Sequence, residues 1–256
     1  MEMSAPRETA SFALSLLDLT NLRNTCDEAE IEQLCLRAQT PFGLTAAICI
    51  WPRFVAQARD MLGADHPLRI ATAVNFPIGN SPVATVVKQA NAAVENGAAE
   101  IDLLIPYRQF LSGSDAAVTE MVTAVRAACP SACLKVIIEA GELKDSGHIR
   151  RASELAIDAG ADFIKTSTGK AVVNATLEAA DIMLRTVRES GKPVGFEASG
   201  GVDTVTDADL YLRLGETIMG TDWIMPSTFR FGALDLLDDI TVILGATSSQ
   251  HASNGY

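Results

Sequence analysis

Basic residues are scarce in this sequence. Its 20 Lys and Arg residues face 32 Asp and Glu residues, giving a formal net charge of −12, and only six of the 256 residues are lysines. A polyanion is bound by clustered Lys and Arg, so the composition disfavours nucleic acid as a partner and, for the same reason, an anionic membrane surface. No apolar run approaches the roughly 20 residues that span a bilayer, and the N-terminal residues lack the features of a secretion signal.

Histidine and cysteine are also sparse. The three histidines, at positions 66, 148 and 251, are scattered and join no second Cys or His cluster, so we expect no zinc site. An odd number of cysteines does not suit a full disulfide framework. The sequence therefore predicts a cytoplasmic protein with reduced thiols and no metal. The five cysteines are Cys26, Cys35, Cys49, Cys129 and Cys133.

What the sequence does contain is an alternation of two patterns. Short β-branched runs bounded by turn residues predict strands at 45–50, 69–75, 100–105, 134–139, 162–165 and 193–196, with weaker ones at 16–19 and 216–219. Between them, amphipathic stretches predict helices at 27–38, 53–62, 81–96, 114–127, 145–159 and 176–189.

Eight strand–helix units in about 250 residues is the count of a (β/α)8 TIM barrel, an α/β fold. The alternative, a doubly wound open sheet, usually carries a GxGxxG turn after its first strand, and this sequence has none. No linker or low-complexity segment divides the chain. We therefore predict one domain over residues 1–256, with an N-terminal helical extension and a polar C-terminal tail at about 246–256.

In a TIM barrel the chemistry takes place at the carboxyl ends of the strands. Most polar residues predicted there lie inside or just after apolar runs, where a charge is costly unless it is paired. The pattern indicates a ring of carboxylates around one lysine. The polar residues predicted at these strand ends are Asp18, Cys49, Asn75, Asp102, Glu139, Lys165 and Glu197.

Lys165 ends an apolar strand, where desolvation would lower the pKa of its amine. A neutral amine attacks carbonyls and forms a Schiff base, whereas the alternative is a buried ion-pair partner or a snorkelling lysine. Asp102 shares a strand face with Leu104, which predicts that it points into the barrel. There it would transfer protons at the substrate or pair with Lys135 or Lys165, and the two roles are compatible.

Several segments are distinctive: 17–20, 43–54, 75–80, 134–139, 229–233 and, most specific, Ala-Asp-Phe-Ile-Lys-Thr-Ser-Thr-Gly-Lys at 161–170. On these segments the sequence resembles, from end to end, the deoxyribose-phosphate aldolase family of class I aldolases. The resemblance implies a TIM barrel that reversibly cleaves 2-deoxyribose 5-phosphate to acetaldehyde and glyceraldehyde 3-phosphate. It also implies that no metal or cofactor takes part, and it makes a homodimer one expectation.

The resemblance assigns roles to single residues. Lys165 corresponds to the Schiff-base lysine, Asp102 to an acid/base aspartate acting through a bound water, and Tyr256 to a C-terminal tyrosine that assists proton transfer at the donor carbon. The substrate-binding positions implied in the same way are Lys170 near the phosphate, Cys49 in the pocket, and Asp18 and Thr20 lining it.

The seventh strand departs from the family pattern Gly-Phe-Lys-x-x-Gly-Gly, because residues 195–201 read Gly-Phe-Glu-Ala-Ser-Gly-Gly. The family's lysine places a cation beside the Schiff-base amine, whereas Glu197 would raise the pKa of that amine. Lys165 would then rely on desolvation alone, or Glu197 would itself be protonated or act as a catalytic base. The simpler alternative is an ion pair between Glu197 and Lys165 or Lys170.

The predicted phosphate site departs as well. Gly200 and Gly201 keep the glycine nest that supplies backbone N–H groups to an anion. However, Asp203 stands where members of the family often have a basic residue, and the carboxylate of Asp235 would repel a phosphate dianion at short range. An unphosphorylated acceptor is therefore an open alternative. The remaining predicted substrate-binding residues are Gly169, Ser199 and Leu234, the last of which stands in a Gly-Ala-Leu-Asp segment where the family has Gly-Ala-Ser-Ser.

Three hypotheses follow. The first is an aldolase of this family, acting on the phosphorylated sugar or on another aldehyde. The second is a Schiff-base lyase or isomerase that uses Glu197 as general base, and the third is a noncatalytic relative that binds a metabolite. The end-to-end resemblance favours the first, while the carboxylate at position 197 favours the other two.

Overall fold

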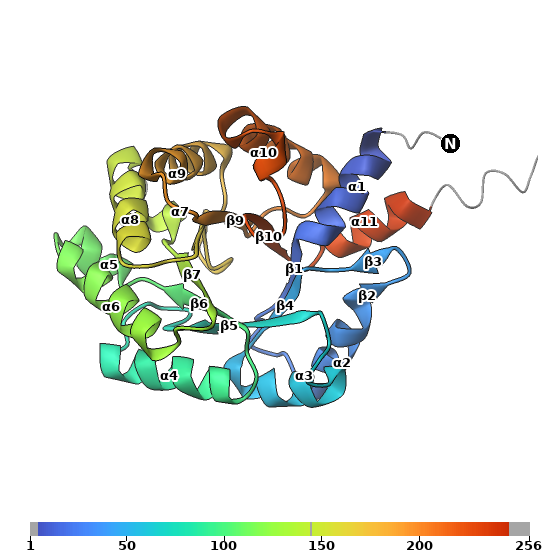
Figure 1. Cartoon of the computed structure of the whole chain (residues 1–256), viewed down its shortest axis with the longest axis horizontal. Helices are drawn as coiled ribbons and strands as arrows, with labels where there is room; N and C mark the ends of the chain where they lie inside the picture. Colours follow the sequence, from blue (N-terminus) through green and yellow to red (C-terminus); the bar gives the residue numbers. More distant parts are fainter. Residues whose placement is uncertain (1–4, 144, 246–256) are drawn as a thin grey trace, which may run out of the picture.

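The computed structural model of the chain is a closed barrel of eight parallel strands surrounded by helices (Figure 1), which confirms the predicted TIM-barrel fold. It describes residues 5–143 and 145–245, so the predicted tail and Tyr256 lie outside the described residues. The strands follow one another around the barrel in the order β1-β10-β9-β8-β7-β6-β5-β4. They are β1 Leu17–Asn21, β4 Ala47–Ile50, β5 Arg69–Val74, β6 Glu100–Leu104, β7 Cys133–Ile137, β8 Phe163–Lys165, β9 Gly195–Ser199 and β10 Phe229–Ala233.

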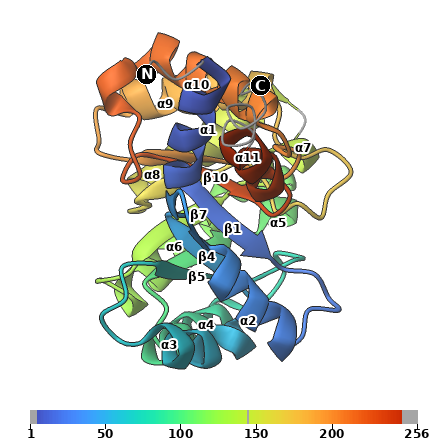
Figure 2. The ribbon, with the colours of Figure 1, turned by 90° about the vertical axis from the view of Figure 1, so that its right-hand side faces the viewer.

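Helices cover the outside of the barrel, and α1 runs directly into β1, packing against α10 and α11 (Figure 2). The longer ones are α1 Ala5–Leu16, α2 Glu28–Arg37, α3 Val55–Leu62, α4 Val83–Glu95, α6 Asp115–Ala128, α8 Ser146–Asp158, α9 Leu177–Ser190, α10 Val205–Met219 and α11 Leu236–Gly245. Short helices are α5 Tyr107–Leu111 and α7 Ala140–Leu143, with 3-10 turns at Pro52–Phe54 and Thr221–Trp223. Within the described residues, no helix is both long enough and apolar enough to cross a membrane.

The helix boundaries follow from capping side chains. Asp27 and Glu30 form a reciprocal capping box at the start of α2, because each side chain accepts a hydrogen bond from the other residue's backbone N–H. Thr204 and Asp207 do the same for α10. The C-terminal end of α9 is capped by Gly191, whose left-handed φ of 64° suits a glycine.

Seven of the eight predicted strands overlap a barrel strand, but the predicted last strand was wrong. Residues 216–219 form the final turn of α10, and the strand that closes the barrel is β10, Phe229–Ala233. The structure also adds a small antiparallel hairpin, β2 Gln39–Thr40 and β3 Gly43–Leu44, that the sequence patterns did not predict.

Two different cores lie on the two faces of the strands. Outward-facing apolar side chains pack against the helices, and Phe196, Phe229 and Phe231 are fully buried there. The barrel interior, usually filled by layers of branched apolar residues, instead holds charged side chains. These are Asp18, Glu100, Asp102, Lys135, Lys165, Glu197 and Arg230, each no more than 4% exposed.

Candidate active site

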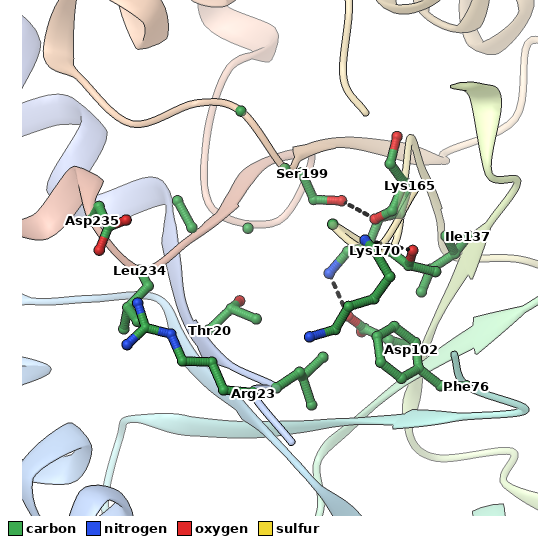
Figure 3. Close-up of a pocket in the computed structure, with 18 of the residues that line it drawn as sticks. Thr20, Arg23, Phe76, Asp102, Ile137, Lys165, Lys170, Ser199, Leu234 and Asp235 are labelled. Carbon is green, nitrogen blue, oxygen red and sulfur yellow. Dashed lines mark hydrogen bonds and ion pairs between the residues drawn. The ribbon is translucent and has the colours of Figure 1, made fainter. Parts of the chain in front are cut away.

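A cleft of about 200 Å³ opens at the carboxyl ends of the barrel strands (Figure 3). Its walls come from strand ends and the loops that follow them: β1, β6, β8, β9 and β10 all contribute. This is the face on which TIM-barrel enzymes carry their active sites. The lining residues that matter below are Thr20, Arg23, Phe76, Asp102, Lys165, Gly169, Lys170, Ser199, Gly200, Gly201, Asp203, Leu234 and Asp235.

Lys165, the last residue of β8, forms the floor of this cleft and is 4% exposed. Its Nζ lies 2.6 Å from Asp102 Oδ2 and 2.6 Å from Glu197 Oε1. Both carboxylates are buried, but Asp102 lines the cleft and Glu197 does not. The lysine therefore sits between two carboxylates, of which only one faces the space a substrate would occupy.

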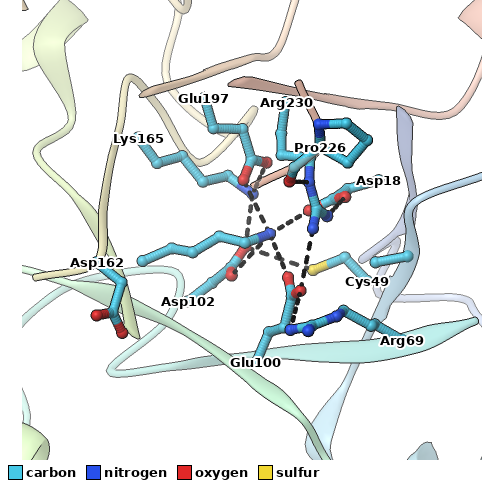
Figure 4. A network of polar contacts seen from close by, with 12 residues as sticks. Asp18, Cys49, Arg69, Glu100, Asp102, Asp162, Lys165, Glu197, Pro226 and Arg230 are labelled. Atoms are coloured by element: carbon cyan, nitrogen blue, oxygen red, sulfur yellow. Dashed lines mark hydrogen bonds and ion pairs between the residues drawn. The ribbon is translucent and has the colours of Figure 1, made fainter. Parts of the chain in front are cut away.

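The network extends from Lys165 and Glu197 to Asp18, Glu100 and Arg230 (Figure 4), and a second lysine joins these groups. Lys135 Nζ lies 3.0 Å from Glu197 Oε2 and 2.8 Å from Glu100 Oε2, and it donates a hydrogen bond to Asp18 Oδ2. Arg230 pairs with Asp18 and, at 3.3 Å, with Glu100. Buried charges are tolerated only when they are paired in this way, because removing one partner leaves the other uncompensated.

The network sets the protonation of Lys165. Burial alone would lower the pKa of the Lys165 ammonium, but the facing carboxylates Asp102 and Glu197 outweigh it and raise the pKa above its ordinary value. Desolvation thus does not leave the amine neutral, contrary to the effect expected of burial alone. Burial raises the pKa of the Glu197 carboxyl, although Lys135 and Lys165 oppose the shift.

One glycine makes room for this arrangement. Gly232 of β10 lies against Glu197 and Lys165, and a Cβ atom added there would stand 2.6 Å from Glu197 Oε1 and 3.3 Å from Lys165 Nζ. The Phe-Arg-Phe-Gly-Ala segment therefore supplies both a buried cation, Arg230, and the gap beside the ion pair.

The loop after β8 is fixed from a neighbouring strand end. Glu139, in the left-handed region at φ 56°, accepts a hydrogen bond of 3.1 Å from the backbone N–H of Thr168. Thr168 in turn accepts one from the backbone N–H of Lys170 through its hydroxyl. This chain of contacts places Gly169 and Lys170 in the cleft wall, close to the glycine pair that follows β9.

Most predicted site residues meet in this one place. Asp18 and Cys49 lie with Glu197 in the charged layer below the floor, where Cys49 Sγ is 3.7 Å from Asp102 Oδ2 and burial raises the pKa of the thiol. Glu197 pairs with Lys165 and Lys135, so no ion pair links it to Lys170. The predicted residues that line the cleft are Thr20, Asp102, Lys165, Gly169, Lys170, Ser199, Gly200, Gly201, Leu234 and Asp235.

Sequence reasoning missed three charged residues. Glu100 shares the strand face of Asp102, and that alternation was the available signal for its inward position. Arg230 interrupts an apolar run and gave the same kind of signal, whereas Arg23 follows β1 in an exposed loop and gave none. Among the described residues, no group of three or more His, Cys, Asp or Glu side chains is arranged to hold a metal ion.

Comparison with known proteins assigns the family. The sequence model of the DeoC/LacD family aldolases matches residues 12–222. The chain belongs to this aldolase family. It is 62% identical to the deoxyribose-phosphate aldolase of Agrobacterium fabrum (strain C58) over 257 aligned residues, covering 100% of this chain and 99% of that relative. This aldolase is accordingly an aldehyde-lyase.

Solved structures show the same fold at lower identity. A protein of Toxoplasma gondii ME49, provisionally named a deoxyribose-phosphate aldolase, superposes with a TM-score of 0.87 at 22% identity, covering 96% of this aldolase and 97% of that chain. The tetrameric deoxyribose phosphate aldolase of Aeropyrum pernix superposes with a TM-score of 0.73 at 22% identity, covering 96% and 94%. At such identities the likeness concerns the fold alone.

Proposed function

We propose that this aldolase reversibly cleaves 2-deoxyribose 5-phosphate to acetaldehyde and glyceraldehyde 3-phosphate through a Schiff base on Lys165. One observation carries the proposal: a single lysine amine lies on the cleft floor, 2.6 Å from a carboxylate that also faces the cleft. The name of the 62% identical relative supports the choice of substrate. We expect no cofactor, and a homodimer stays a prediction.

The reaction would begin when Lys165 gives up a proton to Asp102, 2.6 Å away, and the neutral Nζ attacks the C1 carbonyl of the open-chain sugar. The resulting carbinolamine loses water and leaves an iminium ion. A base then takes the proton of the C3 hydroxyl, the C2–C3 bond breaks, and its electron pair forms the C1–C2 double bond of an enamine. Protonation of C2 and hydrolysis release acetaldehyde and restore Lys165.

Asp102 is the group we assign to these proton transfers. It reaches Lys165 with one oxygen and lines the cleft, so a water bound beside it would connect it to the sugar hydroxyl. Tyr256 is predicted to assist at C2 and lies outside the described residues. Cys49, Asp18 and Thr20 remain predicted substrate-site residues; Thr20 lines the cleft, whereas Cys49 and Asp18 are buried and do not line it.

Glu197 has two predicted roles, general base and ion-pair partner, and its surroundings favour the second. Its two oxygens face Lys165 and Lys135, and it does not line the cleft, whereas the equally buried Asp102 does. A base that acts on the substrate needs hydrogen-bond reach to it. The lyase or isomerase alternative loses support for this reason, and membership of an aldolase family disfavours the noncatalytic one.

The acceptor end of the cleft supports a phosphate group. Gly200 and Gly201 follow the seventh barrel strand and Leu234 follows the eighth, which is where TIM barrels commonly bind phosphate. Asp203 and Asp235 oppose this, and burial together with the charge of Asp235 raises the pKa of Asp203. We therefore propose the phosphorylated acceptor and retain the unphosphorylated one as an alternative for direct test.

The test is to trap the Schiff base. The protein is incubated with acetaldehyde and reduced with borohydride, and the adduct is located by peptide mass spectrometry. We expect it on Lys165, lost in Lys165→Arg and kept in the control Lys192→Arg, whose amine pairs with Asp158 on the surface. Absence of an adduct on Lys165 would overturn the proposal. If the adduct forms, comparing the turnover of deoxyribose 5-phosphate with that of deoxyribose decides between the phosphorylated and the unphosphorylated acceptor.

A further inference from the structure

The cleft carries a cation that belongs to none of the predicted sets. Arg23 lies two residues beyond the end of β1 and lines the cleft together with Lys170. In the view of Figure 3, Arg23 lies beside Leu234 and Asp235, while Lys170 reaches in from the side of Lys165. The two cations therefore approach the acceptor end of the cleft from different strands.

The backbone of Arg23 is fixed while its guanidinium is available. Its N–H donates to Asn21 Oδ1 at 3.2 Å, and its carbonyl accepts a hydrogen bond of 3.0 Å from Trp51 Nε1 and one of 3.1 Å from the N–H of Cys26. Within the described part of the chain, the guanidinium of Arg23 and the amine of Lys170 form no ion pair or side-chain hydrogen bond. A rigid backbone thus presents an unpaired cation to the cleft.

The two cations interact with each other. Burial lowers the pKa of the Lys170 ammonium, and the charge of Arg23 lowers it further. Two like charges that share a cleft repel each other, and an anion bound between them is attracted to both. Arg23 and Leu234 also line a neighbouring hollow that contains Gln33 and Arg37.

We propose that Arg23 is a specificity-determining residue that binds the anionic group of the acceptor, a phosphate monoester, together with Lys170 and the glycine loops. The planar guanidinium donates two parallel hydrogen bonds to phosphate oxygens, a geometry that the point charge of a lysine does not offer. Its charge offsets the carboxylates of Asp203 and Asp235 on the same cleft wall. This inference rests on the proposed aldol reaction for its substrate.

The substitution Arg23→Gln tests this role. Losing a charge-assisted contact to phosphate should weaken inorganic phosphate binding, measured by titration calorimetry, about tenfold or more. The KM for deoxyribose 5-phosphate should rise by a similar factor with kcat little changed, and kcat/KM for unphosphorylated deoxyribose should stay the same. Arg23→Lys should recover part of the loss, because it keeps the charge without the fork.

The matched control is Arg37→Gln, which removes a nearby guanidinium that is already paired with Asp238 at 2.6 Å. It should leave phosphate binding unchanged. Equal phosphate binding in Arg23→Gln and the unaltered protein would overturn the inference, as would equal losses for both sugars. Acetaldehyde trapping on Lys165 does not involve Arg23, so failure of the proposed reaction is recognised separately.

Discussion

Replacing Glu197 by Gln should accelerate Schiff-base formation. The substitution keeps the shape of the side chain and removes the negative charge 2.6 Å from Lys165 Nζ. Because that charge stabilises the ammonium form, its removal lowers the pKa of Lys165 and increases the fraction of neutral, nucleophilic amine at pH 7. Asp102 stays in place, so the lysine keeps one carboxylate partner.

The size of the effect has a lower limit. Two unit charges about 2.6 Å apart interact by about 1.6 kcal/mol even at the dielectric constant of bulk water, and by about 6 kcal/mol at an effective value of 20. The lower figure corresponds to about one pKa unit, which is a tenfold change in the neutral fraction. We therefore expect the rate of acetaldehyde trapping at pH 7 to rise about tenfold or more.

The assay is borohydride trapping followed over time, with circular dichroism to check folding. The control is Glu100→Gln, which removes a carboxylate from the same network but contacts Lys135 and Arg230 instead of Lys165. It should change the trapping rate much less. A fall in the rate for Glu197→Gln would refute the reasoning and identify Glu197 as a group that takes up a proton during the reaction.

Three further outcomes are expected. Asp235→Asn should lower the KM for deoxyribose 5-phosphate by about two- to fivefold, the range for an exposed charge, and leave that for deoxyribose unchanged; a higher KM would contradict the repulsion. Gly232→Ala should destabilise the protein by about 1–3 kcal/mol in urea unfolding because its methyl group meets Glu197, whereas Gly245→Ala, which meets nothing, should cost less. Asp18 has a pKa lowered from 3.8 to about 2, because Arg230 and Lys135 outweigh the raising effect of burial. Its stabilisation is present above about pH 4 and lost as the pH falls toward 2, so the free energy of unfolding should drop by about 2 kcal/mol over that interval; a flat profile would argue against the pairing.

The spacing of apolar residues predicted the barrel elements well wherever it followed clearly either the strand or the helix period. It failed at 216–219, where adjacent Thr, Ile and Met resemble a strand, although Tyr211, Gly215 and Ile218 are buried at helical spacing. It also failed at the true last strand, because Arg230 interrupts the apolar run. A charge inside a strand is explained only by partners from distant strands, and those contacts are not visible in a local pattern.

The candidate site likewise contains residues that the sequence predicted and features that only the structure shows. Lys165, Asp102 and Glu197 stood out because a charge inside or just after an apolar run requires a partner, and each has one. The direction of the Lys165 pKa needed the structure, since burial and two carboxylates act against each other and distances decide which prevails. Arg23 lies in an exposed loop whose composition is ordinary, so only its position over the cleft distinguishes it.

The charged barrel interior constrains how this aldolase can change. Four buried carboxylates, Asp18, Glu100, Asp102 and Glu197, are matched by three buried cations, Lys135, Lys165 and Arg230, and by the half-exposed Arg69, which reaches Glu100 at 3.3 Å. Replacing one charged side chain leaves its partner with an uncompensated charge away from solvent, whereas replacing both partners keeps positive and negative charges equal in number. Single changes in this interior are therefore expected to cost stability, and libraries that vary one position at a time will miss paired changes that keep the charges balanced.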